Sequence, residues 1–166
     1  MISKIKVPMS QPAFDTETEN YMFDVIKSGW WSQGKITEQF EKNLSEYFPS
    51  NAIVVNNGTS AITAALLAHG IKPGDKVVVP DYTFIATCSA AKIIGAEILV
   101  ADVDPNTLNV RPESIEKLVK ENDVKAVMIV DMAGLPVDLE PIIELSKRYK
   151  FVLIEDAAQA IGSEYK

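Results

Sequence analysis

Apolar residues recur along the chain with two different spacings, and the change between them falls near residue 50. Over residues 16–28 and 37–48 they return every three or four positions, which predicts two amphipathic helices. Residues 1–14 show neither spacing and are expected to form an extended arm. Residues 1–50 should therefore consist of an N-terminal arm and two helices.

From residue 51 onward, short apolar runs alternate with helical patterns. The runs are rich in Val and Ile and are bounded by turn residues, as is typical of strands buried on both faces. They lie at residues 52–55, 76–79, 97–101, 125–130 and 151–154, with helical patterns between them at 59–69, 83–94, 112–121 and 138–150. This alternation predicts βαβ units and a parallel sheet in an α/β fold.

The loop after the first predicted strand has the composition of a phosphate site. All loops that leave the carboxyl ends of parallel strands open on one edge of the sheet, where ligands bind. In the segment 56–60, Gly58 permits close approach of the backbone. The hydroxyls of Thr59 and Ser60 stand beside the unpaired N–H groups of a helix start. The sequence is equally compatible with a plain helix cap at Thr59 or Ser60.

Later loops add a ring and a carboxylate to the same edge. The segment 80–84 carries two aromatic residues, which are usually core but can also offer a flat stacking surface. Asp156 and Gln159 follow the last predicted strand among small residues, where a lone Asp could simply cap a turn. Taken together, the loops describe a pocket for a phosphorylated aromatic cofactor. For pyridoxal phosphate, a carboxylate would keep the pyridine nitrogen protonated.

A dinucleotide pocket is the main rival from the residues alone. Asp81 lies at the end of the second predicted strand, where a ribose-binding acid is found in such proteins. The first loop, however, holds one glycine and lacks the G-x-G-x-x-G spacing. The sequence therefore disfavours dinucleotide binding.

Charge and rare residues exclude several other classes. The formal net charge of −7 disfavours a nucleic-acid or anionic-membrane partner. Cys88, the single cysteine, cannot form an internal disulfide, which fits a cytoplasmic protein. His69 has no second His or Cys with which to build a metal site. No apolar run approaches membrane-spanning length.

Several short motifs occur in an order and spacing that identify a family. They are Ser28-Gly-Trp30, Asn57-Gly-Thr-Ser-Ala61, Gly74-Asp-Lys-Val77, Pro80-x-x-Thr-Phe-x-Ala-Thr87, Gly134-x-Pro-x-Asp138 and Glu155-Asp-Ala-Ala-Gln-Ala160. Over nearly its whole length the chain resembles the DegT/DnrJ/EryC1/StrS aminotransferases. These are pyridoxal-phosphate enzymes that mostly transfer an amino group to a nucleotide-linked keto-sugar.

The resemblance assigns a role to each loop residue. It implies that Thr59 and Ser60 hold the cofactor phosphate, with the Gly58 backbone alongside. It further implies that Phe84 stacks on the pyridine ring, that Asp156 pairs with the ring nitrogen and that Gln159 bonds the phenolic oxygen. At Asp131, many members have histidine.

The resemblance also implies an architecture and partners. The fold would be the fold-type I large domain, a doubly wound and mostly parallel sheet, of which residues 51–166 would supply the first five strands. The chain would end before the last strands and the small C-terminal domain. Members work as homodimers on a nucleotide-sugar and an amino-acid donor. The Trp30 and Trp31 loop would lie near the substrate or the dimer contact.

One expected group is missing from the sequence. In the family, the lysine that forms the Schiff base follows a Ser-Phe pair beyond the Glu-Asp-x-x-Gln segment, so it would lie after Lys166. The chain alone is therefore expected to be inactive as an aminotransferase. Two alternatives remain: a non-catalytic binding or regulatory module with the same fold, and a sugar dehydratase in which histidine replaces the lysine.

Overall fold

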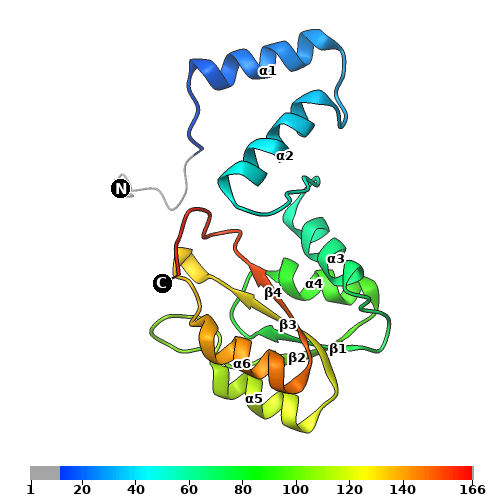
Figure 1. Cartoon of the computed structure of the whole chain (residues 1–166), viewed down its shortest axis with the longest axis vertical. Helices are drawn as coiled ribbons and strands as arrows, with labels where there is room; N and C mark the ends of the chain where they lie inside the picture. Colours follow the sequence, from blue (N-terminus) through cyan, green and yellow to red (C-terminus); the bar gives the residue numbers. More distant parts are fainter. Residues whose placement is uncertain (1–11, 166) are drawn as a thin grey trace, which may run out of the picture. The chain divides into compact units, whose positions relative to one another are not determined.

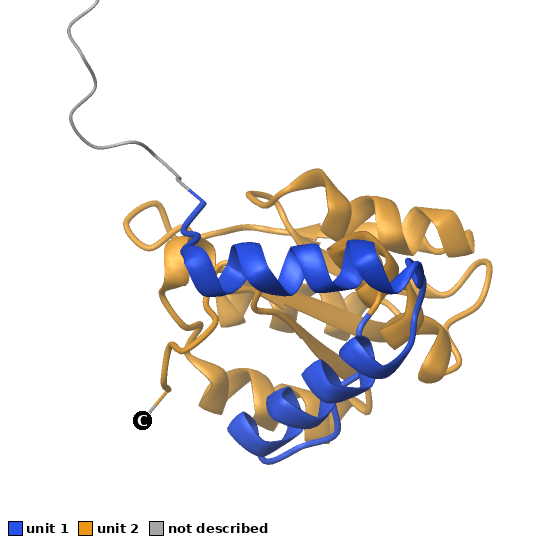
Figure 2. Ribbon diagram, turned by 90° about the horizontal axis from the view of Figure 1, so that it is seen from above, with its two compact units in different colours: residues 1–54 blue, residues 55–166 orange. Residues whose placement is uncertain are grey.

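A computed structural model of the protein describes residues 12–165. The chain divides into two units, residues 1–54 and residues 55–166 (Figure 2). Most of the predicted arm, residues 1–11, lies outside the described residues, as does Lys166. None of the helices in the described part is both long and apolar enough to span a bilayer.

The first unit contains the two predicted helices, α1 (Thr16–Ser28) and α2 (Lys35–Tyr47). The side chain of Asp15 caps α1 by accepting a hydrogen bond of 2.9 Å from the Thr18 N–H. Gly29 ends the helix with φ at 68°, a left-handed conformation that glycine adopts without steric cost. Neither helix buries a residue, so both apolar stripes remain exposed.

The second unit is a parallel sheet covered by helices on both faces (Figure 1). Its strands are β1 (Lys76–Pro80), β2 (Glu97–Ala101), β3 (Val124–Val130) and β4 (Val152–Asp156). Its helices are α3 (Gly58–Ala68), α4 (Ile85–Ile94), α5 (Pro112–Glu121) and α6 (Leu139–Tyr149), with a 3-10 turn, η1 (Met132–Gly134). Within the described residues the strand order is β2-β1-β3-β4, and every neighbouring pair is parallel. The predicted α/β class is confirmed.

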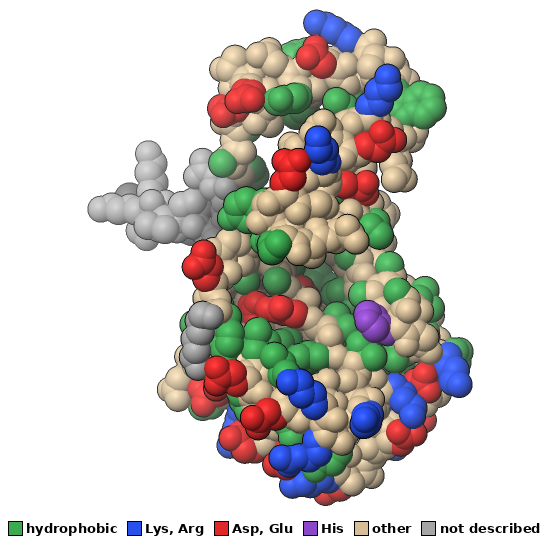
Figure 3. Space-filling model, in the orientation of Figure 1, with side chains coloured by type: hydrophobic (Ala, Val, Ile, Leu, Met, Phe, Trp, Pro, Cys, Tyr) green, Lys and Arg blue, Asp and Glu red, His purple; other side chains and the backbone are tan. Residues whose placement is uncertain are grey.

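Alternate residues of each strand face opposite sides of the sheet and build two cores. Val78, Val127 and Ile129 pack with residues of α5 and α6 on one side. Val77 and Met128 pack with residues of α3 and α4 on the other. On the face drawn in Figure 3, basic and acidic side chains are mixed over this unit, so that face carries no patch of a single sign.

The strand predicted at residues 52–55 is not formed. A strand needs a neighbour to complete its ladder of hydrogen bonds, and no described strand pairs with this segment. Side chains of α2 accept hydrogen bonds from the backbone of this segment instead. The Ala52 N–H donates to Ser45 Oγ at 3.0 Å, and the Val54 N–H donates to Glu41 Oε1 at 2.8 Å. The loop before α3 therefore does not follow a sheet strand, and the described residues contain four strands rather than five.

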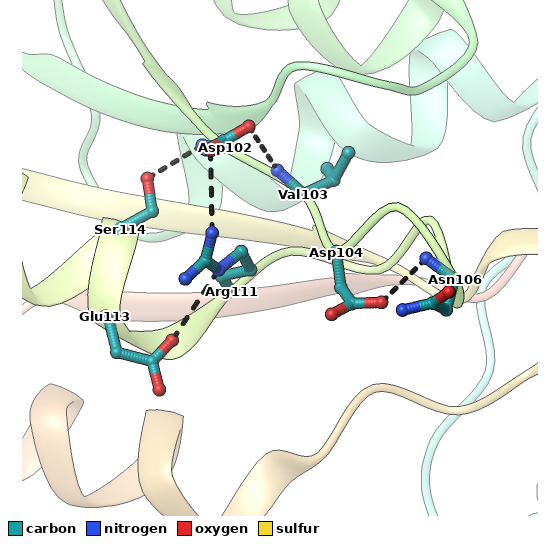
Figure 4. Close-up of polar contacts among 7 residues, drawn as sticks. All are labelled: Asp102, Val103, Asp104, Asn106, Arg111, Glu113 and Ser114. Atoms are coloured by element: carbon teal, nitrogen blue, oxygen red, sulfur yellow. Dashed lines mark hydrogen bonds and ion pairs between the residues drawn. The ribbon is translucent and has the colours of Figure 1, made fainter.

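A polar turn joins β2 to α5 (Figure 4). Asp104 Oδ1 accepts hydrogen bonds from the N–H groups of Asn106 and Thr107, which lower the pKa of Asp104 below its usual range. Ser114 Oγ accepts a hydrogen bond of 2.7 Å from the Asp102 N–H, and Arg111 lies 3.8 Å from the Asp102 carboxylate. These contacts fix the course of residues 102–111 before α5 begins.

Candidate functional site

Asp156, at the carboxyl end of β4, is joined to the start of α4. The buried hydroxyl of Thr87 donates to Asp156 Oδ2 at 3.0 Å, and Thr87 in turn lies 2.9 Å from the hydroxyl of Thr83. The backbone N–H of Thr87 donates to the carbonyl of Phe84, which caps α4 with its ring exposed. Thr87 thus connects the Asp156 carboxylate to the N-terminus of α4, where Phe84 has an exposed ring.

Gln159 is oriented by the loop that follows β3. Its Oε1 accepts a hydrogen bond of 2.8 Å from the Ala133 N–H in η1. Since Oε1 faces Ala133, the Nε2 amide group is the part of the side chain that can donate to a ligand. A phenolic oxygen is an acceptor, so this orientation has the polarity that the predicted role of Gln159 requires.

The phosphate candidates lie at the first turn of α3. Asn57, rather than Thr59 or Ser60, caps this helix, because its Oδ1 accepts from the Ser60 N–H at 2.9 Å. By helix geometry, the first N–H groups of α3 have no intrahelical acceptor, and nothing lies within 4 Å of the position of a Cβ on Gly58. An open hollow of about 430 Å³ lies against Thr59 and Ser60.

The structure joins only some of the predicted site residues. Phe84 and Asp156 are linked through Thr87, and Gln159 follows Asp156 in the chain. The hollow at α3 is lined by Asn57, Thr59, Ser60, Thr63 and Ile93, and that set includes neither Phe84 nor Asp156.

Asp131 and Glu155 form an acidic pair on the other face of the sheet from Asp156. Asp131 is 2% exposed, and its Oδ1 accepts a hydrogen bond of 2.9 Å from the Val137 N–H. Partial burial of the Glu155 carboxyl, followed by a hydrogen bond to Asp131 and its charge, raises the pKa of Glu155 from 4.5 to about 7. The Glu155 carboxyl therefore keeps its proton to a higher pH than an ordinary glutamate does.

Trp30 and Trp31 lie in the first unit, between α1 and α2. The indole N–H of Trp30 donates to the Gln33 carbonyl at 2.9 Å, and both rings are exposed. They line an apolar hollow of about 910 Å³ together with Ile26 and Ile36. A Cβ on Gly34 would stand 2.6 Å from Trp30 Nε1, so glycine is required for this packing.

Two polar residues around this site were assigned no role from the sequence, although Thr87 ends one of the family motifs. Thr87 contacts Asp156 across 69 positions, and Asn109 contacts the loop after β3 across 23 to 27 positions. Thr87 lies inside a helical pattern, where a threonine carries no local signal of its partner. Asn109 follows a turn-forming segment, in which asparagine is common.

Comparison with known proteins gives a consistent result. The model of the DegT/DnrJ/EryC1/StrS aminotransferase family matches residues 12–166. GDP-perosamine synthase of Caulobacter vibrioides is 36% identical over 97% of this chain. The crystal structure of an aminotransferase from Psychrobacter cryohalolentis is 37% identical over 95% of the chain, with a TM-score of 0.87. NtdA of Bacillus subtilis, solved with its cofactor PMP bound, is 36% identical over 87%, with a TM-score of 0.82.

The chain is shorter than these proteins. It spans 44% of the length of the Caulobacter synthase, 41% of the Psychrobacter enzyme and 33% of NtdA. The comparison therefore covers one continuous part of each relative.

Proposed function

The chain belongs to the DegT/DnrJ/EryC1/StrS aminotransferase family, and on that premise we propose that it contributes the cofactor-binding loops of a pyridoxal-phosphate-dependent sugar aminotransferase. The substrate class we propose is a nucleotide-linked keto-sugar, because GDP-perosamine synthase is among the relatives. The protein would act as a homodimer, with an amino acid as donor and the Trp30 and Trp31 loop near the substrate or the dimer contact.

The observation that carries the proposal is the Phe84, Thr87 and Asp156 arrangement. A carboxylate oriented by a buried hydroxyl suits a protonated pyridine nitrogen. The exposed ring of Phe84, at the start of α4, suits the flat face of the same heterocycle. When bound, pyridoxal phosphate draws electrons from the substrate carbon. Asp156 sustains that effect by keeping a proton on the ring nitrogen.

The remaining residues fit the other polar groups of the cofactor. Gln159 would donate from Nε2 to the phenolic oxygen, because its Oε1 already accepts from the Ala133 N–H. Thr59 and Ser60, with the Gly58 backbone, offer hydroxyls and helix N–H groups to the phosphate. The hollow of about 430 Å³ beside them leaves room for that group.

We further propose that no lysine of residues 1–166 attaches the cofactor, so the 166-residue chain binds pyridoxal phosphate without turning over substrate. The test is to incubate the chain with pyridoxal phosphate, treat the mixture with borohydride to reduce any Schiff base, and measure the mass of the protein by mass spectrometry. Bound cofactor should be released on denaturation, and amino transfer from L-glutamate to a GDP-linked keto-sugar should be absent. A stoichiometric adduct at one lysine, or sustained transfer, would contradict the proposal.

A further inference from the structure

The loop after β3 contains a backbone conformation that needs support. Ala133 adopts φ at 54° and Gly134 φ at 84°, so a residue with a Cβ occupies the left-handed region. Such a conformation is strained for alanine and persists only when neighbouring groups hold it. The supporting groups can therefore be identified from the hydrogen bonds around the loop.

Asn109 spans this turn on both sides of Ala133. Its Oδ1 accepts a hydrogen bond of 3.1 Å from the Met132 N–H. Its Nδ2 donates to the carbonyls of Leu135 at 2.9 Å and Pro136 at 3.3 Å. Asn109 is 7% exposed, so these contacts form largely away from water, where an unsatisfied amide is costly.

Asn109 is itself held in place by backbone hydrogen bonds within the turn that joins β2 to α5. Its carbonyl accepts a hydrogen bond of 2.9 Å from the Asp104 N–H, and the Leu108 N–H donates to the Asp104 carbonyl at 2.7 Å. The neighbouring Val103 and Val110 form an antiparallel bridge. The Asn109 amide therefore reaches the 132–136 turn from a well-ordered segment.

The geometry points to Asn109 as a positioning residue for Gln159. Asn109 fixes the strained turn, and the turn orients the Ala133 N–H. That N–H donates to Gln159 Oε1 at 2.8 Å, which leaves Nε2 as the group that would donate to the cofactor. Asn109 touches neither the cofactor nor the substrate in this scheme. The inference rests on the proposed role of Gln159 in binding pyridoxal phosphate.

The test combines hydrogen exchange with a double-mutant cycle on the 166-residue chain. Asn109→Ala removes all three hydrogen bonds, while Asn109→Asp keeps the volume and the acceptor but loses the donor. Without cofactor, NMR should show the Ala133 amide exchanging about tenfold faster in both variants, with the Met128 amide in β3 unchanged. Calorimetric titration with pyridoxal 5′-phosphate should show binding weakened about five- to tenfold by either variant and by Gln159→Ala.

The variant that carries both substitutions distinguishes a positioning role of Asn109 from a general loss of structure. If Asn109 acts through Gln159, then Asn109→Ala added to Gln159→Ala should weaken binding no further. Asn122→Ala is the matched control, because Asn122 also makes two side-chain hydrogen bonds, to Leu118 and Lys76, just before β3 begins. That variant should leave the affinity for pyridoxal phosphate unchanged.

Three results would overturn the inference. Additive losses in the double variant, or unchanged Ala133 exchange in the Asn109 variants, would show that Asn109 does not act through this turn. Failure of the wild-type chain to bind pyridoxal phosphate would contradict the proposed function, and the positioning role would fall with it. Hydrogen exchange would then still report whether Asn109 holds the turn.

Discussion

At the scale of single residues, local sequence revealed the groups that could meet a ligand but not those that hold them. Asp156 and Gln159 stand out because they follow a strand among small residues. Thr87 and Asn109 do not stand out, because the residues to which their side chains hydrogen-bond lie 23 or more positions away in the sequence. The positioning of a site is set by tertiary contacts, which a single sequence does not display.

The hydroxyl of Thr87 should contribute both to stability and to cofactor affinity. Thr87→Val keeps the shape of the side chain but removes the donor to Asp156 Oδ2, at a cost of about 1 kcal/mol in the free energy of unfolding. Thr87→Ser keeps the hydroxyl and should bind pyridoxal phosphate more tightly than the valine variant. Urea denaturation measures the stability, and calorimetric titration measures the affinity for pyridoxal phosphate. Equal stability and equal affinity of the valine and serine variants would contradict this role.

The Asp131 and Glu155 pair should make stability depend on pH. The native state keeps a proton on Glu155 up to about pH 7, whereas the unfolded chain releases it near 4.5, so the native state binds more protons between these values. The free energy of unfolding should therefore fall as pH rises across this window. The contribution is fully present below about pH 4.5 and lost above about pH 7.

Glu155→Gln provides the comparison for this effect. The wild type should lose more stability than the variant between pH 5 and pH 7.5, by less than about 1 kcal/mol because water screens an exposed side chain. Urea denaturation at both pH values measures the difference. If the free energy of unfolding depended on pH in the same way in both proteins, Glu155 would not bind a proton more tightly in the native state than in the unfolded chain.

At the scale of elements, hydrophobic spacing predicted every helix and four of the strands to within a few residues. The exception is residues 52–55, whose composition is that of a strand but whose amides bond to Ser45 and Glu41. Ile53 is 83% exposed, so the segment also lacks the burial that its composition predicts. Strand formation depends on a neighbour, and no property of the segment itself reveals whether one is present.

The cap of α3 decides between the two interpretations of the phosphate loop. Because Asn57 supplies the capping oxygen, Asn57→Ala should lower the free energy of unfolding by about 1 kcal/mol. Ser60→Ala should change stability by less than about 0.5 kcal/mol, yet weaken binding of pyridoxal phosphate. Loss of stability in Ser60→Ala without loss of binding would restore the interpretation of Ser60 as a plain cap.

At the scale of the whole molecule, the stabilising core belongs to residues 55–166. Both clusters of buried apolar residues lie there, whereas α1 and α2 bury none. The sequence predicted a division near residue 50, and the structure divides after residue 54. Composition shows where the spacing of apolar residues changes, but it does not show which elements find a partner to pack against.

A chain shortened to residues 55–166 should therefore unfold cooperatively. We expect its free energy of unfolding to lie within about 1 kcal/mol of that of the full chain, since the removed helices bury no side chains. Urea denaturation followed by circular dichroism compares the two. A non-cooperative transition in the shortened chain would show that residues 1–54 complete the core.

The most direct test of the account is the protonation of the cofactor ring. Pyridoxal phosphate labelled with ¹⁵N in the ring can be bound to the 166-residue chain and observed by NMR at neutral pH. We expect a protonated nitrogen with the wild type and an unprotonated one with Asp156→Asn. The same nitrogen signal in both proteins would show that Asp156 does not face the ring, and the assignment of the site would be wrong.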